Sequence, residues 1–272
     1  MNRVCILTDS SVQFTRPDFG VEEHIIKIPF ARTSSLTSST SRKVSRNKDH
    51  FGFESPSELE IRKLFSNLRR DYSDILVITL SSALSGLFSE VGKLIKQNGD
   101  VGHIQVIDSH TTSVGLGLLV QIAVNLAAQG AALRDIERQL RISIPHIYTL
   151  LCLPNLSYLA AANFLSPSQA VVGEMLDLLP IFSLEDGCLT AIQKVRTQRH
   201  LLETFQEFVD EFCDPVHVVL IKNGNQLKAP VFRDYVINNF PRTVYSEQMM
   251  GVPLAELLGP QSVGLIVMDK QT

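Results

Sequence analysis

The sequence predicts an α/β protein in which a mostly parallel sheet with flanking helices is followed by a second, α+β domain. Two observations support this fold class. Short apolar runs of strand length alternate with segments of helical periodicity over the first half of the chain, and this alternation is lost from about residue 154. At 272 residues, the chain is long enough for two domains that each bury a core. We therefore expect an α/β domain over residues 1–153 and an α+β domain over residues 154–272.

The first half contains runs typical of buried strands and segments typical of helices. Strands are expected at residues 4–7, 24–30, 75–80, 104–107 and 148–153, and helices at residues 57–70, 87–97, 113–128 and 135–142. In the first of these helices, Ile61, Phe65 and Leu68 recur at a spacing of three to four and form one apolar face. The helix over residues 113–128 is apolar almost all round, which predicts that it is buried.

The second half has a different pattern. Helices are expected at residues 155–163, 169–178, 197–212 and 229–239, and strands at residues 180–184, 189–195, 216–221 and 262–268. Between the first two of these strands, Glu185-Asp186-Gly187 is a hairpin turn signal.

Composition and spacing exclude several classes of function. A net charge of −3 gives no general attraction to nucleic acid or to an anionic membrane surface. No apolar run approaches the roughly 18 residues that a membrane span needs. The four cysteines lack C-x-x-C spacing, and the histidines lack H-x-x-x-H spacing. We therefore expect a cytoplasmic protein with reduced thiols, without a metal site and without a nucleotide-type cofactor.

Residues 31–48 differ from the rest of the chain. They include nine Ser or Thr and five Arg or Lys, with no acidic residue. Such a segment buries too little apolar surface to order itself, so a mobile surface loop is the favoured interpretation. The alternative is a basic flap over the mouth of a binding site.

Three hydroxyl-rich segments follow predicted strands. They are Thr8-Asp9-Ser10-Ser11, Ser81-Ser82-Ala83-Leu84-Ser85-Gly86, and Asp108-Ser109-His110-Thr111-Thr112-Ser113. Ligands of open α/β sheets bind outside the carboxyl ends of the strands, so these segments converge there if their strands are neighbours. Hydroxyl groups and the free N–H groups of a helix start bind a carboxylate or phosphate well. The alternative is three ordinary turns in which these side chains cap helices.

Catalytic patterns fit less well. His110 lies two residues from Asp108 and near several serines, so a hydrolytic triad is conceivable, but no G-x-S-x-G elbow is present. Arg196 and Arg199 follow the strand over residues 189–195 and form a cationic strand end that could contact an anion. A solvated basic turn is the alternative for that pair.

In order along the chain, these segments resemble the DegV family of fatty-acid-binding proteins. Thr8-Asp9-Ser10-Ser11 is similar to the family's TDS start, and residues 81–86 match its SSxLSG motif. Further matches, in order, are Val106-Ile107-Asp108-Ser109, Ser113-Val114-Gly115-Leu116-Gly117, Leu156-Ser157-Tyr158-Leu159, Lys194-Val195-Arg196 and Leu258-Gly259-Pro260. The resemblance implies a two-domain protein that holds one long-chain fatty acid in an apolar tunnel, with the SSxLSG serines on the carboxylate. It also implies presentation of that fatty acid to a separate fatty-acid kinase.

The chain departs from the family pattern where the head group is bound. Phe164 stands where the family's GGRI has arginine, Leu257 replaces a histidine, Gln261 replaces the second glycine of GPG, and Phe51-Gly52 falls near the family's Thr-Ser. These changes remove polar partners worth roughly 1.5–3 kcal/mol each in favourable settings. An apolar tunnel does not depend on them, since each buried CH₂ contributes about 0.8 kcal/mol. The departures therefore bear on the kinase partnership more than on lipid binding.

We thus expect non-catalytic binding of a long-chain fatty acid between two domains. The expected ligand-binding residues are Ser81, Ser82, Ser85, Gly86, Thr8, Asp9, Ser10, Ser113, Phe164 and Arg196. Two alternatives stay open: a Ser/His hydrolase that uses His110 on an ester, and a divergent relative that has lost its lipid.

Overall fold

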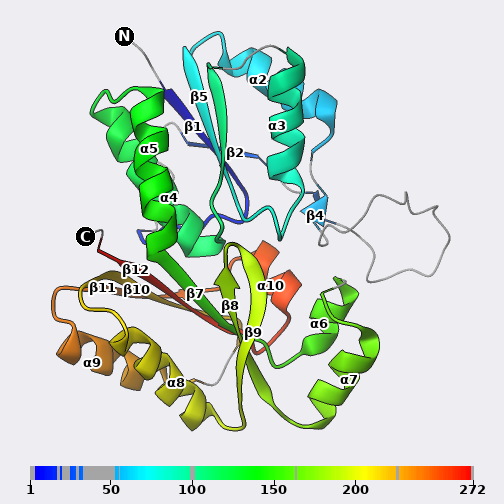
Figure 1. Ribbon diagram of the computed structural model, residues 1–272, viewed down its shortest axis with the longest axis vertical. Helices are drawn as coiled ribbons and strands as arrows, with labels where there is room; N and C mark the ends of the chain where they lie inside the picture. Colours follow the sequence, from blue (N-terminus) through cyan, green and yellow to red (C-terminus); the bar gives the residue numbers. More distant parts are fainter. Residues whose placement is uncertain are drawn as a thin grey trace.

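The computed structural model describes residues 4–16, 19, 25–28, 31–32, 53–54, 56–98, 102–162, 164–224 and 227–270. Within these residues the chain forms two β-sheets, which lie one above the other in Figure 1, with helices around them and one helix between them. A further pair of very short strands, β3 (Ala31–Arg32) and β4 (Phe53–Glu54), forms an antiparallel ladder of its own.

The upper sheet is parallel and has the strand order β2-β1-β5-β6. Its strands are β2 (Ile25–Ile28), β1 (Val4–Asp9), β5 (Asp74–Thr79) and β6 (Ile104–Asp108). The sequence predicts all four strands and their parallel arrangement. Every residue of β5 is buried, because helices cover both faces of the sheet.

Two helices, α2 (Glu58–Leu68) and α3 (Leu87–Asn98), cover one face of this sheet. Ile61, Phe65 and Leu68 of α2 are buried against Cys5 and Leu7 of β1 in one apolar cluster, as the periodicity predicts. The helix α2 begins with a capping box. The Ser57 amide donates to Glu60 Oε2 at 2.8 Å, and the Glu60 amide donates to Ser57 Oγ at 3.4 Å.

The other face is covered by α4 (Ser113–Ala128) and α5 (Leu133–Ser143). The helix α4 contacts β1 and β5 of the upper sheet and β7 and β12 of the lower sheet. It is therefore the element between the two sheets, which explains why its sequence is apolar almost all round. Glycines stand at residues 115 and 117 because other chain segments approach the helix closely here. A Cβ on Gly117 would lie 1.8 Å from the Gln13 carbonyl oxygen.

The lower sheet has six strands in the order β11-β10-β12-β7-β8-β9, and only β10 and β11 are parallel. Its strands are β7 (Ile147–Cys152), β8 (Leu179–Glu185), β9 (Cys188–Val195), β10 (Pro215–Lys222), β11 (Val244–Met249) and β12 (Val263–Asp269). The helices α8 (Gln198–Asp210) and α9 (Ala229–Asn239) pack on one face. The helices α6 (Leu156–Ala161), α7 (Pro167–Met175) and α10 (Val252–Leu258) lie at the side seen on the right of Figure 1.

One strand is placed differently from the sequence-based prediction. The strand over residues 148–153 was expected with the parallel strands of the first half, but β7 pairs antiparallel with β8 and β12 in the lower sheet. The physical reason is the path of α4, α5 and the short turn η1 (Ile144–His146), which carries the chain past the upper sheet. The domain boundary at residues 153/154 stays a prediction, and the pairing of β7 favours a position before Ile147.

The sequence also misses β11 and α10. Polar residues make up half of β11, which forms one edge of the lower sheet, and α10 has only seven residues. Residues 33–48 of the basic segment, together with Phe51 and Gly52, lie outside the described residues. Among the helices that the structure describes, none is long and apolar enough to cross a membrane.

Candidate functional site

The turn over residues 81–86 connects β5 to α3 at the carboxyl edge of the upper sheet. Its backbone forms one helical turn, in which the amides of Leu84 and Ser85 donate to the Ser81 carbonyl oxygen at 2.9 and 3.1 Å. The cap of α3 is Ser85, whose Oγ accepts from the Leu87 amide at 3.2 Å. Capping and ligand binding, which the sequence leaves as alternatives, are therefore compatible at Ser85, whose oxygen accepts from α3 while its O–H can still donate.

The three hydroxyl-rich segments converge, as their strand-end positions predict. The Ser81 amide donates to the Thr111 carbonyl oxygen at 2.9 Å, and the Ser109 amide donates to the Thr79 carbonyl oxygen at 3.1 Å. From the segment after β1, Asp9 Oδ2 accepts from the Leu80 amide at 2.6 Å. The turns after β1, β5 and β6 are thus hydrogen-bonded into one polar edge.

The protein's own carboxylates use part of this edge. Asp108 accepts from the Ser82 amide with both oxygens, at 3.1 Å each. Asp9 is fully buried and accepts from the Ser11 amide at 2.9 Å, from Ser11 Oγ at 2.6 Å and from Leu80. Burial raises the pKa of Asp9 to about 6, although these hydrogen bonds lower it. Asp9 and Asp108 therefore join the turns to one another with amides that an external anion could otherwise take.

The hydroxyl of Ser81 is also engaged, by the second half of the chain. Ser81 is 1% exposed, and its Oγ donates to the Gly187 carbonyl oxygen at 2.8 Å. Gly187 lies in the turn between β8 and β9, which reaches up to the parallel sheet in Figure 1. The sequence predicts this hairpin turn but gives no sign of its contact with Ser81, because the contact joins residues far apart in the chain.

The remaining predicted residues of the three segments differ in their surroundings. Ser82 is exposed, Ser10 is half-buried, and Gly86 is buried. Thr8 is fully buried, and within the described residues its Oγ1 has no hydrogen-bond partner. Ser113 is also fully buried and has a positive φ of 53°, and its Oγ donates to Gln13 Oε1 at 2.6 Å.

The two predicted residues from the second half lie apart from each other. Phe164 is half-buried and packs against the apolar core between the sheets. Arg196 is exposed and follows the last residue of β9, whereas Cys188, beside the Gly187 turn, is the first. The length of β9 therefore separates Arg196 from Ser81, and the structure does not bring Arg196 to the convergent turns.

The geometry for hydrolysis is not assembled in the described residues. His110 Nε2 lies 3.7 Å from Asp108 Oδ2, but no described hydrogen bond joins the His110 ring to a serine hydroxyl. The hydroxyl of Ser81 instead donates to a carbonyl oxygen. No group of three or more His, Cys, Asp or Glu side chains that could hold a metal ion occurs in the described part of the chain.

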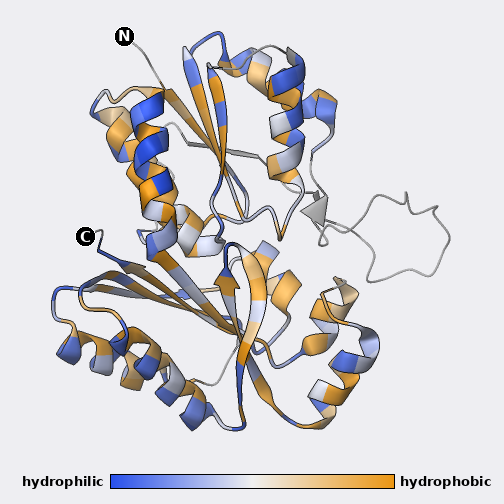
Figure 2. Cartoon of the chain, in the orientation of Figure 1, coloured by the Kyte–Doolittle hydropathy of each residue, from blue (hydrophilic) through white to orange (hydrophobic). Residues whose placement is uncertain are grey.

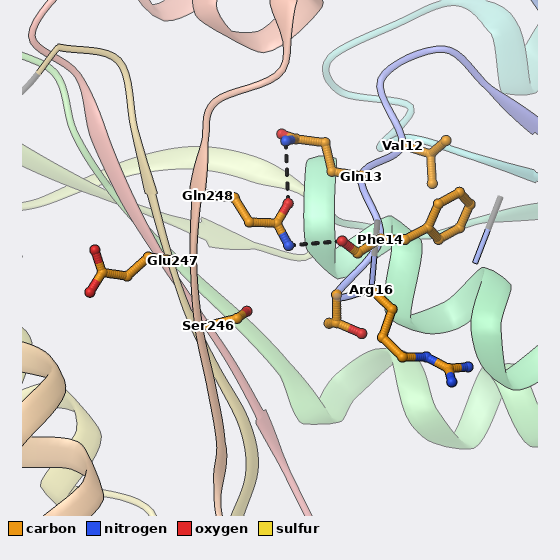
Figure 3. A pocket seen from close by; sticks show the side chains of 8 residues that line it. Val12, Gln13, Phe14, Arg16, Ser246, Glu247 and Gln248 are labelled. Atoms are coloured by element: carbon orange, nitrogen blue, oxygen red, sulfur yellow. Dashed lines mark hydrogen bonds between the residues drawn. The ribbon is translucent and has the colours of Figure 1, made fainter. Parts of the chain in front are cut away.

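A residue that sequence reasoning misses, Gln13, joins the two halves of the molecule. Its Oε1 accepts from Ser113 Oγ at 2.6 Å and from the Gly251 amide at 2.7 Å, and its Nε2 donates to the Met249 carbonyl oxygen at 2.8 Å. Next to it, Gln248 Nε2 donates to the Phe14 carbonyl oxygen at 2.8 Å (Figure 3). We call these interactions the Gln13 junction. Gln13 lies outside the hydroxyl-rich segments and outside any helix or strand, so no local pattern marks it.

Two of the surface pockets formed by described residues lie away from the convergent turns. One, of about 440 Å³, lies beside the Gln13 junction between residues 12–16 and residues 246–248 (Figure 3). The other, of about 470 Å³, lies between α2 and α3. Neither is lined by Ser81, Ser85 or Phe164. At the convergent turns themselves, the turn that carries Gly187 covers the Ser81 hydroxyl.

The fold combines a parallel sheet with a mixed sheet, and the buried helix α4 lies between them. Hydroxyl-rich turns lie at the carboxyl edge of the parallel sheet. The chain is thus an α/β protein of two sheets with a polar turn cluster at one sheet edge. The chain belongs to the DegV family, a family of uncharacterised proteins whose model matches residues 3–270. A DegV domain-containing protein of Caldanaerobacter subterraneus is 27% identical over 222 residues, which cover 79% of this chain and 77% of that protein. Another from Staphylococcus aureus is 23% identical over 290 residues, covering 99% and 100% of the two chains.

Solved structures share the fold. A fatty acid binding DegV family protein from Streptococcus agalactiae superposes with a TM-score of 0.81 at 19% identity, over 99% of this chain and 100% of that chain. The fatty acid kinase B3 protein of Streptococcus pneumoniae, determined with linoleic acid, gives a TM-score of 0.78 at 16% identity, with 99% and 100% coverage. Identities this low show a common fold.

Proposed function

We propose that this protein binds one long-chain fatty acid and does so without catalysis. The carboxylate would lie at the convergent turns, and the acyl chain would lie among the apolar side chains between the two sheets. The observation that carries the proposal is the convergence of residues 81–86 with the turns after β1 and β6 in a chain of the DegV family. The structural relatives from Streptococcus agalactiae and Streptococcus pneumoniae, named as fatty acid binding and as loaded with linoleic acid, support the same ligand class.

Donors remain at the turns for a carboxylate. Within the described residues, the Ser82 hydroxyl and the Gly86 amide have no hydrogen-bond partner, and the Ser85 hydroxyl has no acceptor. These three groups lie within one turn next to the start of α3, where the helix dipole favours negative charge. They could hold an anionic head without an arginine, which agrees with Phe164 in the place of that residue.

Apolar side chains are available for the acyl chain. Phe164, Leu165, Leu184 and Leu189 are partly buried and pack against the core between the sheets. In Figure 2, orange hydrophobic residues occur along β8 and β9 and in the helices α6, α7 and α10. Because these side chains pack against the core, an acyl chain that lies among them would have to displace some of them. Each CH₂ that it buries would contribute about 0.8 kcal/mol.

A role in presenting the fatty acid to a separate kinase is a finer proposal. It is supported by the Streptococcus pneumoniae relative, whose name assigns it to a fatty acid kinase. We also propose a cytoplasmic location, supported by four free cysteines of which Cys188 and Cys213 are exposed.

The test is native mass spectrometry of the purified protein, followed by lipid extraction and titration with oleate. We expect one fatty acid per chain, and we expect Ser85→Ala to weaken oleate binding about tenfold to 150-fold, as loss of one hydrogen bond to a charged group would. Ser66→Ala is the control, since Ser66 is exposed on α2, away from the turns.

A second candidate is a DegV relative that has lost its lipid. The closed arrangement at Ser81 and the packed Phe164 favour it. A protein that is purified empty and ignores both oleate and palmitate would establish this alternative and refute the first.

A further inference from the structure

We propose that the turn between β8 and β9 is a latch on the head-group site: Gly187 occupies the Ser81 hydroxyl, and the turn must withdraw before a carboxylate can use that hydroxyl. This inference rests on the proposed function, which it extends to the control of ligand entry. It assigns a role to Gly187, a residue of the second half that lies outside the SSxLSG turn.

The contact between the turn and Ser81 is tight. Besides the hydrogen bond of 2.8 Å from Ser81 Oγ to the Gly187 carbonyl oxygen, the Gly187 backbone lies close to His110 in the loop after β6. A Cβ added to Gly187 would lie 2.3 Å from Ser81 Oγ and 3.1 Å from the Cα of His110. Only glycine fits, because any side chain would push the turn away from both segments.

The two acceptors compete for a single proton. A serine hydroxyl donates one hydrogen bond, and its oxygen already accepts from the Ala83 amide at 3.2 Å. A carboxylate therefore gains the Ser81 proton only if the Gly187 carbonyl oxygen gives it up. The Gly187 carbonyl oxygen and a carboxylate oxygen would also repel each other if both lay within hydrogen-bond distance of Ser81 Oγ. A charge-assisted bond is about twice as strong as a neutral one, so a bound carboxylate would hold the latch open.

The turn itself contributes no side chain to the apolar core, since it consists of Asp186 and Gly187. It is a tight hairpin in which Asp186 and Gly187 both have positive φ, of 47° and 81°. β9 forms the edge of the lower sheet, and most of its residues are exposed. The Gln13 junction holds the two halves together at the opposite edge strand, β11, so opening at Gly187 leaves that contact intact.

The binding test compares two glycine variants. Gly187→Ala keeps the Ser81 hydroxyl but excludes the closed turn. Gly130→Ala is the matched control, because Gly130 has a similar φ of 83° and no atom within 4 Å of an added Cβ. Stopped-flow mixing with cis-parinarate measures both rate constants. We expect Gly187→Ala to bind about twofold to tenfold more tightly than wild type, mainly through faster association, and Gly130→Ala to match wild type.

Unchanged or weaker binding by Gly187→Ala would contradict the proposal that Gly187 competes with the carboxylate for the Ser81 hydroxyl. The closed turn would then have no effect on fatty acid binding or would strengthen it. If wild type does not bind parinarate at all, the proposed function fails and the competition fails with it.

Hydrogen exchange without lipid tests the closed latch by itself. We expect Ser81→Ala and Gly187→Ala to increase deuterium uptake over residues 184–190 severalfold, whereas Ser66→Ala leaves it unchanged. Equal uptake in all four proteins would show that the Ser81 contact does not hold the turn. This result is independent of fatty acid binding, so it separates failure of the latch from failure of the proposed function.

Discussion

At the scale of single residues, the buried carboxyl of Asp9 is the centre of the polar edge. It receives hydrogen bonds from Ser11 and from Leu80, and so connects the turn after β1 to the turn after β5. Its desolvation raises its pKa to about 6, whereas an unfolded aspartate titrates near about 3.9. Below the lower value both states are protonated, and between the two values the folded state binds more protons. The stabilisation from Asp9 protonation is therefore complete below about pH 4 and is lost as the pH rises through about 6.

Asp9→Asn can test the direction of this pH dependence of stability. Asparagine offers one oxygen and one NH₂ group, so it loses either Ser11 or Leu80 and should cost about 1–3 kcal/mol. The stability difference between wild type and Asp9→Asn, from urea unfolding followed by circular dichroism, should shrink by up to about 3 kcal/mol between pH 4 and pH 7. A difference that grows with pH would mean that the three donors lower the pKa more than burial raises it.

At the scale of secondary-structure elements, α4 packs against both sheets, and its glycines set how closely its neighbours approach. Gly117→Ala should destabilise the protein by about 2–3 kcal/mol, because the new Cβ would overlap the Gln13 carbonyl oxygen. Gly92→Ala in α3 is the matched control. Its Cβ would meet only Val106 Cγ1, at 3.9 Å, so the gain in helix propensity of about 0.5–1 kcal/mol should appear unopposed. Urea midpoints measure both, and equal effects would show that the close approach to Gln13 relaxes.

Elements with strong periodicity were predictable from the sequence, and weakly patterned ones were not. The alternation of apolar runs and amphipathic segments predicts the parallel sheet, and the bounds of α4 and α9 agree with the predicted residues 113–128 and 229–239. The strand β7 was placed in the wrong sheet, since an apolar run carries no information about its partner. The polar composition of β11 and the shortness of α10 hid them.

The candidate site was predictable in its position but not in its connections. Polar clusters at strand ends are visible in the sequence, and topology brings them together. That Asp108 takes the Ser82 amide, or that Gly187 takes the Ser81 hydroxyl, depends on where distant segments lie after folding. The role of Gln13 was missed for the same reason.

At the scale of the whole molecule, one apolar core joins the two sheets. Side chains of β1 and β5 in the upper sheet, of α4, and of β7, β8, β10 and β12 in the lower sheet belong to a single buried cluster. The sheets also share the polar Gln13 junction, in which Gln13 links Ser113 to Met249 and Gly251. A core that spans both sheets favours unfolding of the described structure as one cooperative unit, even if the chain is divided into two domains by its sheets.

Gln13→Ala tests whether the two sheets unfold as one cooperative unit. The substitution removes three short hydrogen bonds and a fourth, of 3.5 Å, to Gln248 Oε1, and it leaves the Gly251 amide and the Ser113 hydroxyl without their acceptor, so we expect a loss of about 2–4 kcal/mol. Gln248→Ala removes the bond to the Phe14 carbonyl oxygen and the long bond of 3.5 Å from Gln13 Nε2, and should cost about 1 kcal/mol. Urea unfolding followed by circular dichroism should give one transition in each protein, with the midpoint lowered and the slope preserved. Two separate transitions in Gln13→Ala would contradict this expectation. They would mean that the junction, rather than the apolar core around α4, makes the two halves unfold together.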